Sequence, residues 1–383
     1  MHFFAKQSVL LENLSILEKA IPVRSPLQII KGIFVEAKNN CLTFMTNNLE
    51  MGIRADCDNV EIKEEGAVVL PEKFVDIIRQ LPSEDIEIKT DGEELRTEIL
   101  SKQTNFFLYG MNADEFPVIT GELLGSQWES LEFSAMELKQ IIKKVSFAVS
   151  QDESKHLFRG ILLEIDMQKN IFCMASDTYR LAYYQKTLKK KMNIQPLRIL
   201  VPGKTLIEIS RIIDDSHEKV ACFFRENEII FKYRNFTFKG RLLEDKFPNF
   251  SNAFPAGFNT KILVNTRLLE KTIGRASLLV HSQNLMITLS INDKMLQVRS
   301  GSEIGRMTEE LILEGKDGDD LEEILLNYRF FLDPLRVLEE DFVEIEFNGP
   351  FGPCIFNYRQ ELDDSLKSYR YLVLPIKIEK KDL

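Results

Sequence analysis

The chain has 383 residues, 44% of them hydrophobic, which at roughly 100–200 residues per domain predicts two to four domains with apolar cores. No run of about 18 uninterrupted apolar residues and no signal-peptide-like start occurs, so a membrane span is excluded and secretion is not expected. The 49 basic and 59 acidic residues give a net charge of −10, which argues against nucleic-acid binding unless the basic residues gather on one surface. The five cysteines are widely separated, which is typical of a reducing cytoplasm and predicts neither a disulfide scaffold nor a metal site.

Periodicity predicts the main elements along the chain. Apolar residues at helical spacing predict helices over 73–81, 134–145, 265–276 and the segment starting at 327. Alternating stretches such as 41–45 and 228–233 predict strands, and acidic, glycine-bearing segments such as 90–93 and 316–319 predict turns. Helices followed by antiparallel strands indicate an α+β architecture.

The chain also repeats itself at about one third of its length. Gly32-Ile33-Phe34-Val35-Glu36 is echoed by Gly160-Ile161-Leu162-Leu163-Glu164, and the segments 45–48, 70–73 and 114–117 recur in the same order about 130 residues later. This period is too long for a solenoid and indicates duplication of whole domains. We therefore predict three repeated domains of two helices on antiparallel sheet, at 1–125, 126–255 and 256–383, with linkers near 119–130 and 250–260.

Basic residues concentrate on the predicted helices. The set comprises Lys73, Arg79, Lys139, Lys143, Lys144, Lys204, Arg211, Arg267, Lys271, Arg275, Arg329 and Arg336. Taken singly, each row is most simply a solvated helix face. If the helices share one surface, however, the protein has a basic track suited to sequence-independent contact with phosphates. No basic motif interleaved with aromatics occurs, so duplex is the favoured ligand over single strands.

No catalytic constellation is apparent. The four histidines stand in no metal-binding motif, and neither a P-loop nor a GxGxxG occurs. The segment 214–217 (Asp-Asp-Ser-His) is more simply a polar turn than a metal site, and the acidic run at 339–341 is more simply a helix end. We predict no catalytic residue, metal or cofactor.

The whole chain resembles the bacterial DNA polymerase sliding clamps, the β subunits of the replicative polymerase. The resemblance rests on the three-domain repeat and on the segments 174–182 (MASDTYRLA), 245–250 (DKFPNF), 302–305 (SEIG), 348–351 (NGPF) and 371–377 (YLVLPIK). It implies a head-to-tail homodimer forming a six-domain ring, in which the helices line the hole around duplex DNA and the sheets form the outer shell. Such a clamp is a non-catalytic processivity factor of the cytoplasm, associated with the nucleoid.

The resemblance further implies three sets of functional residues. Arg24 and Gln151 match positions that touch DNA. A hydrophobic pocket between the second and third domains would bind peptide motifs of the polymerase catalytic subunit, the clamp loader, and repair and translesion polymerases. Its expected residues are Phe158, Ser176, Thr178, Tyr179, Arg180, Leu181, Pro248, Asn327, Phe330, Phe351, Pro353, Leu372, Val373, Leu374, Pro375 and Ile376. Phe106 and Leu108 would meet Leu278 and Leu279 of a second copy across the dimer interface.

Simpler interpretations accompany these assignments. The segment 372–374 could be only a buried last strand, and each of the four interface residues could belong to a core. Thr178-Tyr179 replaces the family's usual small residue and histidine, and a charged tail follows Lys377, so a divergent second clamp with altered partners is one alternative. The others are a clamp-like scaffold that no longer encircles DNA and an enzyme built from scattered carboxylates.

Overall fold

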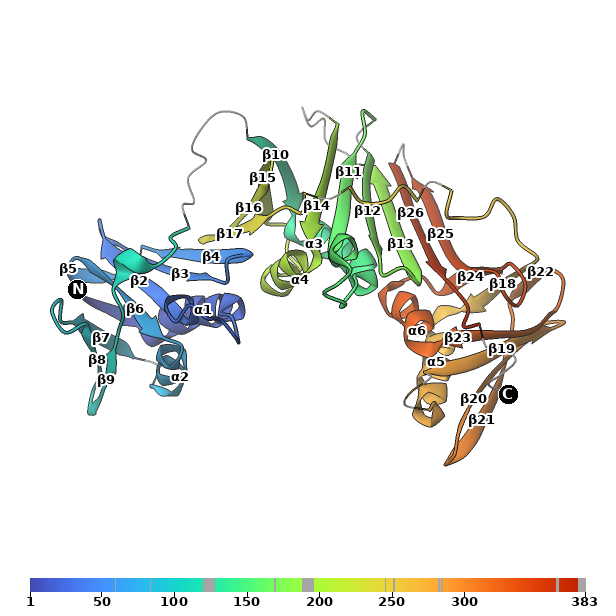
Figure 1. Cartoon of the computed structure of the whole chain (residues 1–383), viewed down its shortest axis with the longest axis horizontal. Coiled ribbons are helices and arrows are strands. Elements are labelled where there is room, and N and C mark those ends of the chain that lie inside the picture. Colours follow the sequence, from blue (N-terminus) through green and yellow to red (C-terminus); the bar gives the residue numbers. More distant parts are fainter. Residues whose placement is uncertain are drawn as a thin grey trace. The chain divides into compact units, whose positions relative to one another are not determined.

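The computed structural model describes residues 1–58, 60–82, 84–119, 128–168, 170–187, 196–244, 246–250, 252–281, 283, 285–362 and 365–377. The chain forms two compact units, Met1–Leu138 with Glu208–Leu242 and Lys139–Ile207 with Leu243–Leu383 (Figure 1). Most of the predicted linker at 119–130 and all of the charged tail at 378–383 lie outside the described residues. None of the described helices is long and apolar enough to cross a membrane.

The first unit contains an eight-stranded antiparallel sheet in the order β10-β15-β16-β17-β4-β3-β2-β6. Its strands are β2 (Gly32–Lys38), β3 (Cys41–Asn47), β4 (Met51–Cys57), β6 (Gly66–Pro71), β10 (Glu129–Ser134), β15 (Lys219–Arg225), β16 (Glu228–Tyr233) and β17 (Phe236–Arg241). Strands β17 and β4 pair with Phe238 opposite Ile53. This pairing joins strands of the first and second sequence repeats in one sheet.

A smaller sheet and two helices complete the first unit. The sheet runs β5-β1-β7-β8-β9, with β1 (His2–Lys6), β5 (Glu61–Glu64), β7 (Asp85–Thr90), β8 (Arg96–Ser101) and β9 (Thr104–Tyr109). Helices α1 (Gln7–Leu17) and α2 (Lys73–Gln80) pack against each other, and short 3₁₀ helices cover Glu18–Ala20, Ile29–Lys31 and Ala113–Glu115. The apolar stripe of α2 is buried through Phe74, Val75 and Ile78, which confirms the predicted helix.

The second unit contains a nine-stranded sheet in the order β14-β11-β12-β13-β26-β25-β24-β18-β22. Its strands are β11 (Gly160–Ile165), β12 (Asn170–Ser176), β13 (Arg180–Thr187), β14 (Leu197–Pro202), β18 (Thr260–Asn265), β22 (Gly315–Gly318), β24 (Phe342–Phe347), β25 (Cys354–Leu362) and β26 (Ser365–Val373). Strands β13 and β26 pair from Arg180 opposite Val373 to Lys186 opposite Lys367. The second and third repeats therefore also share a sheet.

A four-stranded sheet and two helices complete the second unit. The sheet runs β21-β20-β19-β23, with β19 (Met286–Asn292), β20 (Met295–Ser302), β21 (Gly305–Ile312) and β23 (Leu321–Asn327). Helices α5 (Thr266–Ala276) and α6 (Tyr328–Val337) pack together, and both begin at an asparagine cap. The Asn265 side chain accepts from the Leu268 N–H at 2.9 Å, and that of Asn327 accepts from the Arg329 N–H at 3.0 Å.

Two further α-helices are α3 (Ala135–Val145) and α4 (Gly203–Ile212). Short 3₁₀ helices cover Ser146–Ala148, His156–Arg159 and Ser277–Leu279 in the second unit. One local prediction was wrong, because 316–319 is not simply a turn. Residues 315–318 form strand β22, the last strand of the nine-stranded sheet, which pairs with β18 so that Asp317 lies opposite Lys261.

Candidate functional site

The junction of β13 and β26 carries a cavity of about 380 Å³. It is lined by Phe158, Ser176, Thr178, Tyr179, Arg180, Leu181, Pro248, Phe250, Ala253, Pro353, Leu372 and Leu374. All of these except Phe250 and Ala253 belong to the set that the sequence indicated. Strands from the second and third repeats thus supply the two sides of one cavity within the second unit.

The cavity wall is apolar because two paired strands turn leucines to the same face. Leu181 and Leu372 lie directly opposite each other, and with Ile355 they form a buried cluster. Phe250, Ala253 and Phe254 pack against this cluster. The start of the segment predicted as a linker at 250–260 therefore covers the sheet. Sequence periodicity does not predict this packing, because these residues are in neither a helix nor a strand.

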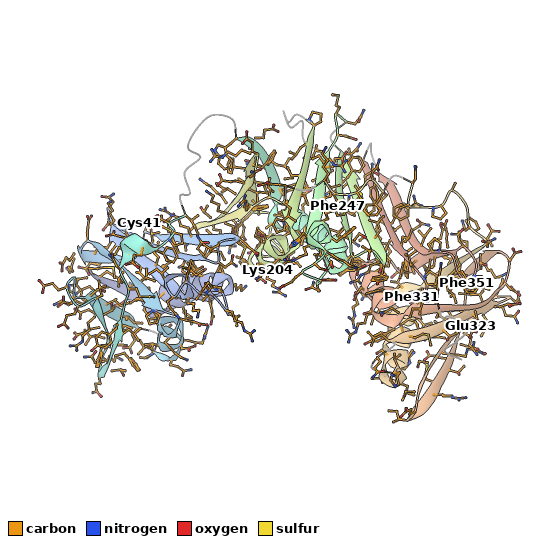
Figure 2. The ribbon with its side chains drawn as sticks, viewed as in Figure 1. Cys41, Lys204, Phe247, Glu323, Phe331 and Phe351 are labelled. Carbon is orange, nitrogen blue, oxygen red and sulfur yellow. The ribbon has the colours of Figure 1, made fainter. Side chains whose placement is uncertain are left out.

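A second aromatic cluster supports the wall formed by Pro248 and Phe250. Phe247 is buried, and its ring centroid lies 5.5 Å from that of Phe250 and 6.1 Å from that of Phe158 (Phe247 is labelled in Figure 2). Edge-to-face contacts of this kind stabilise ring orientation beyond simple burial. The aromatic wall of the cavity is therefore held in place before any ligand arrives.

The loop between β12 and β13 is fixed by its own polar side chains. The Ser176 hydroxyl donates to the Arg180 carbonyl at 2.7 Å and accepts from the Thr178 N–H at 3.2 Å. The Asp177 carboxylate accepts from the N–H groups of Tyr179 and Arg180 at 3.0 and 3.1 Å. Thr178 has a φ of 83°, a conformation that glycine adopts without strain and a β-branched residue does not.

Tyr179 forms the exposed rim of the cavity. Its ring stacks on that of Phe330 at a centroid distance of 6.4 Å, and the Lys155 ammonium lies 4.9 Å from the centre of the Tyr179 ring. Lys155 also donates to the Thr178 hydroxyl at 2.8 Å. Tyr179 is therefore held by an aromatic and a cationic contact, although more than half of it remains exposed.

The Arg180 guanidinium is bound to other groups of the chain, whereas a cation that binds a ligand is expected to be free to contact it. Its guanidinium donates to Asp177 at 2.8 Å, to Asp333 of α6 at 2.6 Å and to the Phe147 carbonyl at 2.6 Å. Burial alone would lower the pKa of Arg180, but the nearby Tyr371, Asp177 and Asp333 raise it overall. The guanidinium therefore ties β13 to α6 and positions the loop.

This ion-pair network gives a stability prediction. Replacing Arg180 by methionine should lower the free energy of unfolding by about 3 kcal/mol, because two partly buried carboxylates lose their counter-charge. Urea unfolding followed by far-UV circular dichroism measures the change. The control is Arg198→Met, which removes the more exposed pair with Glu164 and should cost less than about 1 kcal/mol. Equal losses for the two variants would contradict the assigned role of Arg180.

The other predicted pocket residues lie around the cavity without lining it. Phe330 contacts Tyr179 and lies 4.3 Å below the Arg180 guanidinium, and Asn327 caps α6. Val373 is buried in β26, and the Ile376 N–H donates to the Leu325 carbonyl at 2.8 Å, after the half-buried Pro375. Phe351 is 72% exposed on the turn before β25 (Figure 2).

The predicted DNA-contacting residues are mostly on the surface. Arg24, Lys73, Arg79, Lys143, Gln151, Lys204, Arg267, Lys271, Arg275 and Arg336 are exposed, and Lys139 is half-buried (Lys204 is labelled in Figure 2). Lys144 differs from the prediction of a solvated residue. It is buried and donates to the Val337 carbonyl at 2.6 Å, because this side of α3 meets the end of α6.

Ion pairs divide the exposed cations into two groups. Carboxylates nearby, often one helical turn away, pair with Lys73, Arg79, Arg211, Arg267, Arg275 and Arg336. In the part of the chain that the structure describes, Arg24, Lys143, Lys204 and Lys271 make no ion pair. Their charge is available to an external anion without displacing a carboxylate.

The predicted interface residues lie at sheet edges. Phe106 and Leu108 are on β9, the last strand of the five-stranded sheet. Leu278 is 76% exposed, and Leu279 points toward Gly305 at the start of β21, the edge strand of the four-stranded sheet. The exposure of Phe106 and Leu278 is inconsistent with a core role for these two side chains within the chain.

Groups suited to catalysis do not gather in the described residues. No three metal-ligating side chains lie together there. Burial raises the pKa of both Cys57 and Cys173 to about 12, so these thiols stay protonated at neutral pH. Asp214 and Ser216 of the polar segment at 214–217 bond within it and to Arg234, as expected of a structural turn.

Repeated helix-and-sheet domains that share continuous sheets, with a pocket at one junction, define the molecule as a three-domain clamp. Family models of the DNA polymerase III beta subunit match it throughout: the N-terminal domain at residues 1–120, the central domain at 132–249 and the C-terminal domain at 251–377. The chain belongs to the DNA polymerase III beta subunit family, which confirms the resemblance and the three-domain α+β fold.

Individual relatives agree along the full length. The beta sliding clamp of Staphylococcus epidermidis is 32% identical over 98% of this chain and 99% of its own length. The DNA polymerase sliding clamp of Bacillus subtilis has a TM-score of 0.90 at 28% identity, covering 99% of this chain and all of that one. The DNA polymerase III beta chain of Streptococcus pneumoniae has a TM-score of 0.89 at 26% identity, with 98% of this chain covered.

Proposed function

We propose that the chain is a DNA sliding clamp: a homodimeric ring that encircles duplex DNA and holds the replicative DNA polymerase on it. The observation that carries the proposal is the match to all three beta-subunit domains together with the cavity at the β13–β26 junction. The clamp is a non-catalytic processivity factor, so its role is topological. A clamp on replicating DNA would act in the cytoplasm, at the nucleoid.

Two unpaired sheet edges support head-to-tail dimerisation. The described residues leave one side of β9 and one side of β21 without a strand partner. Exposed edges of this length with apolar side chains promote association, and a second copy can cover both at once. Pairing β9 of one copy with β21 of the next places Phe106 and Leu108 near Leu278 and Leu279 and closes a six-domain ring.

The unpaired cations support contact with DNA phosphates. Changing Lys143, Lys204 and Lys271 together to glutamine should weaken binding of a short labelled duplex more than changing Arg211, Arg267 and Arg275. Both sets remove the same formal charge, but the second set is already paired with carboxylates. The logarithm of the affinity falls as the logarithm of the salt concentration rises, and each lost phosphate contact makes this slope shallower by about 0.9. Fluorescence anisotropy across a salt series measures the slope, and equal slopes for both variants would contradict this division.

The cavity supports recognition of short hydrophobic peptides. Leucine and aromatic walls bury apolar anchor residues, while the fixed loop at Ser176–Tyr179 offers polar groups that orient the chain. The polymerase catalytic subunit, the clamp loader, and repair and translesion polymerases would compete for this one pocket. Thr178 and Tyr179, which replace the family's usual residues, would set the preference among them.

Mass and DNA retention together test the proposal. Light scattering should give twice 44.4 kDa, and the protein, once loaded by a clamp loader with ATP, should stay on circular DNA through a salt wash and leave when the circle is cut. A clamp-like scaffold that does not encircle DNA would show no difference between circular and linear DNA. That result would reject the ring.

A further inference from the structure

A second cavity of about 550 Å³ adjoins the peptide cavity in the second unit. Its lining is Glu164, Phe172, Met174, Tyr183, Gln185, Arg198, Pro248, Asn249, Phe250, Phe254, Ser368 and Arg370. Pro248 and Phe250 line both cavities, so the two are contiguous. The first cavity is mainly apolar, whereas the second contains two arginines.

Strand register places the second cavity one step along the same sheet face. Leu181 and Leu372 form a cross-strand pair in the first cavity, and Tyr183 and Arg370 form the next pair on that face. Side chains two residues apart on a strand are separated by about 7 Å, which an extended peptide covers in about two residues. A ligand anchored at Leu181 therefore reaches Arg370 with residues close to its apolar anchors.

Among the residues that the structure describes, contacts other than ion pairs hold Arg370 in position. Its guanidinium stacks 4.1 Å from the centre of the Phe254 ring, and its Nε donates to the Asn357 side chain at 3.2 Å. Within the described chain no acidic group forms an ion pair with it, although Glu346 is near enough to affect its pKa. Burial lowers the pKa of Arg370, because desolvation disfavours the charged guanidinium.

Arg198 lines the same cavity but is already satisfied. Its guanidinium pairs with Glu164 at 3.3 Å and donates to the Phe247 carbonyl at 3.3 Å. Arg370 is therefore the arginine of this cavity that an incoming anion can approach without displacing a carboxylate. Arg198 supplies a matched control in the same cavity.

The sheet face identifies the kind of anion. Arg180 and Tyr371 are on the opposite face, where the Tyr371 hydroxyl donates to the Phe330 carbonyl of α6 at 2.7 Å. Arg370 therefore lies on the face turned away from the helix, whereas the proposed DNA contacts in the third repeat are on helices. A carboxylate on the peptide already seated in the neighbouring cavity reaches this site directly.

We propose that Arg370 binds a carboxylate of the partner peptide close to its apolar anchors, and that this contact selects among clamp-binding partners. The proposal rests on the proposed function, because the anchors must occupy the first cavity. The carboxylate belongs either to an aspartate or glutamate side chain or to the C-terminus of the partner. Stacked and half-buried, the guanidinium is preorganised to bind it through charge-assisted hydrogen bonds.

Labelled peptides carrying the polymerase's clamp-binding motif test this by fluorescence anisotropy. The parent peptide is capped at both ends; others carry glutamate, or glutamine as control, two residues before or two residues after the apolar anchors. A further pair ends two residues after the anchors in a free carboxylate or an amide. We expect at least one carboxylate peptide to bind about tenfold more tightly than its neutral control.

Variants of the two arginines then show which side chain causes the preference for a carboxylate peptide over its neutral control. Arg370→Met should abolish it while leaving affinity for the capped parent peptide unchanged, which also shows that the pocket is folded. Arg198→Met should retain it. A parent peptide that binds without any carboxylate preference would overturn the inference and leave the proposed function standing. Failure of the parent peptide itself would overturn the proposed peptide pocket and this inference with it.

Discussion

Replacing Leu374 by aspartate is expected to weaken binding of a clamp-motif peptide about a hundredfold. Leu374 lines the peptide cavity just after β26, and its N–H donates to the Tyr179 carbonyl at 2.9 Å. A carboxylate there would face the apolar anchor of the peptide and lose its water when the peptide binds. An uncompensated charge of this kind costs about 3 kcal/mol, which corresponds to two factors of ten in affinity.

The fold should tolerate this change, because Leu374 is 42% exposed. Leu268→Asp is the matched control: Leu268 is 43% exposed, on the first turn of α5, and lies outside the cavity. Isothermal titration calorimetry with one peptide should separate the two variants. Similar affinities for Leu374→Asp and the unmodified protein would rule out this cavity as the peptide site. Arg180→Ala is a poorer test, because its loss disturbs the fold through Asp333.

Replacing Leu278 by aspartate is expected to open the ring. Leu278 is mostly exposed in the single chain, so the substitution should lower the stability of the fold only slightly. In the proposed dimer it is buried against Phe106 of the second copy, where an aspartate would be desolvated on both interfaces at once. The measured mass should fall from twice 44.4 kDa to 44.4 kDa.

Loss of the ring should also abolish retention on closed circular DNA while leaving peptide binding intact. Met167→Asp, at a turn of similar exposure after β11, is the matched control and should remain dimeric. Light scattering gives the mass, and gel filtration of the protein loaded on closed circular plasmid gives the retention. A Leu278→Asp protein that stays dimeric and stays on circular DNA would place the interface elsewhere.

Local sequence patterns predicted the helices well. The stripe in α2 and the segment that became α3 were predictable because a period of 3.6 residues is a property of adjacent sequence. Strand β22 was missed, since its glycines and acidic residues resemble a turn and only its pairing with β18 makes it a strand. Phe250 and Ala253 were missed for the same reason: they follow no period, and their place depends on the leucines beneath them.

The threefold repeat, the α+β domains and the motifs that mark the family can all be read from the order of residues along the chain. Which residues meet depends on the tertiary structure: β13 pairs with β26, Arg180 is bound to Asp333, and Arg370 stacks on Phe254 with no ion pair to any described carboxylate. The reason is physical, because helices and strands are specified by neighbouring residues, whereas hydrogen bonds and ion pairs across the sheet join residues far apart in the chain. Whether a cation is free to bind a partner depends on those distant contacts, and no local pattern records them.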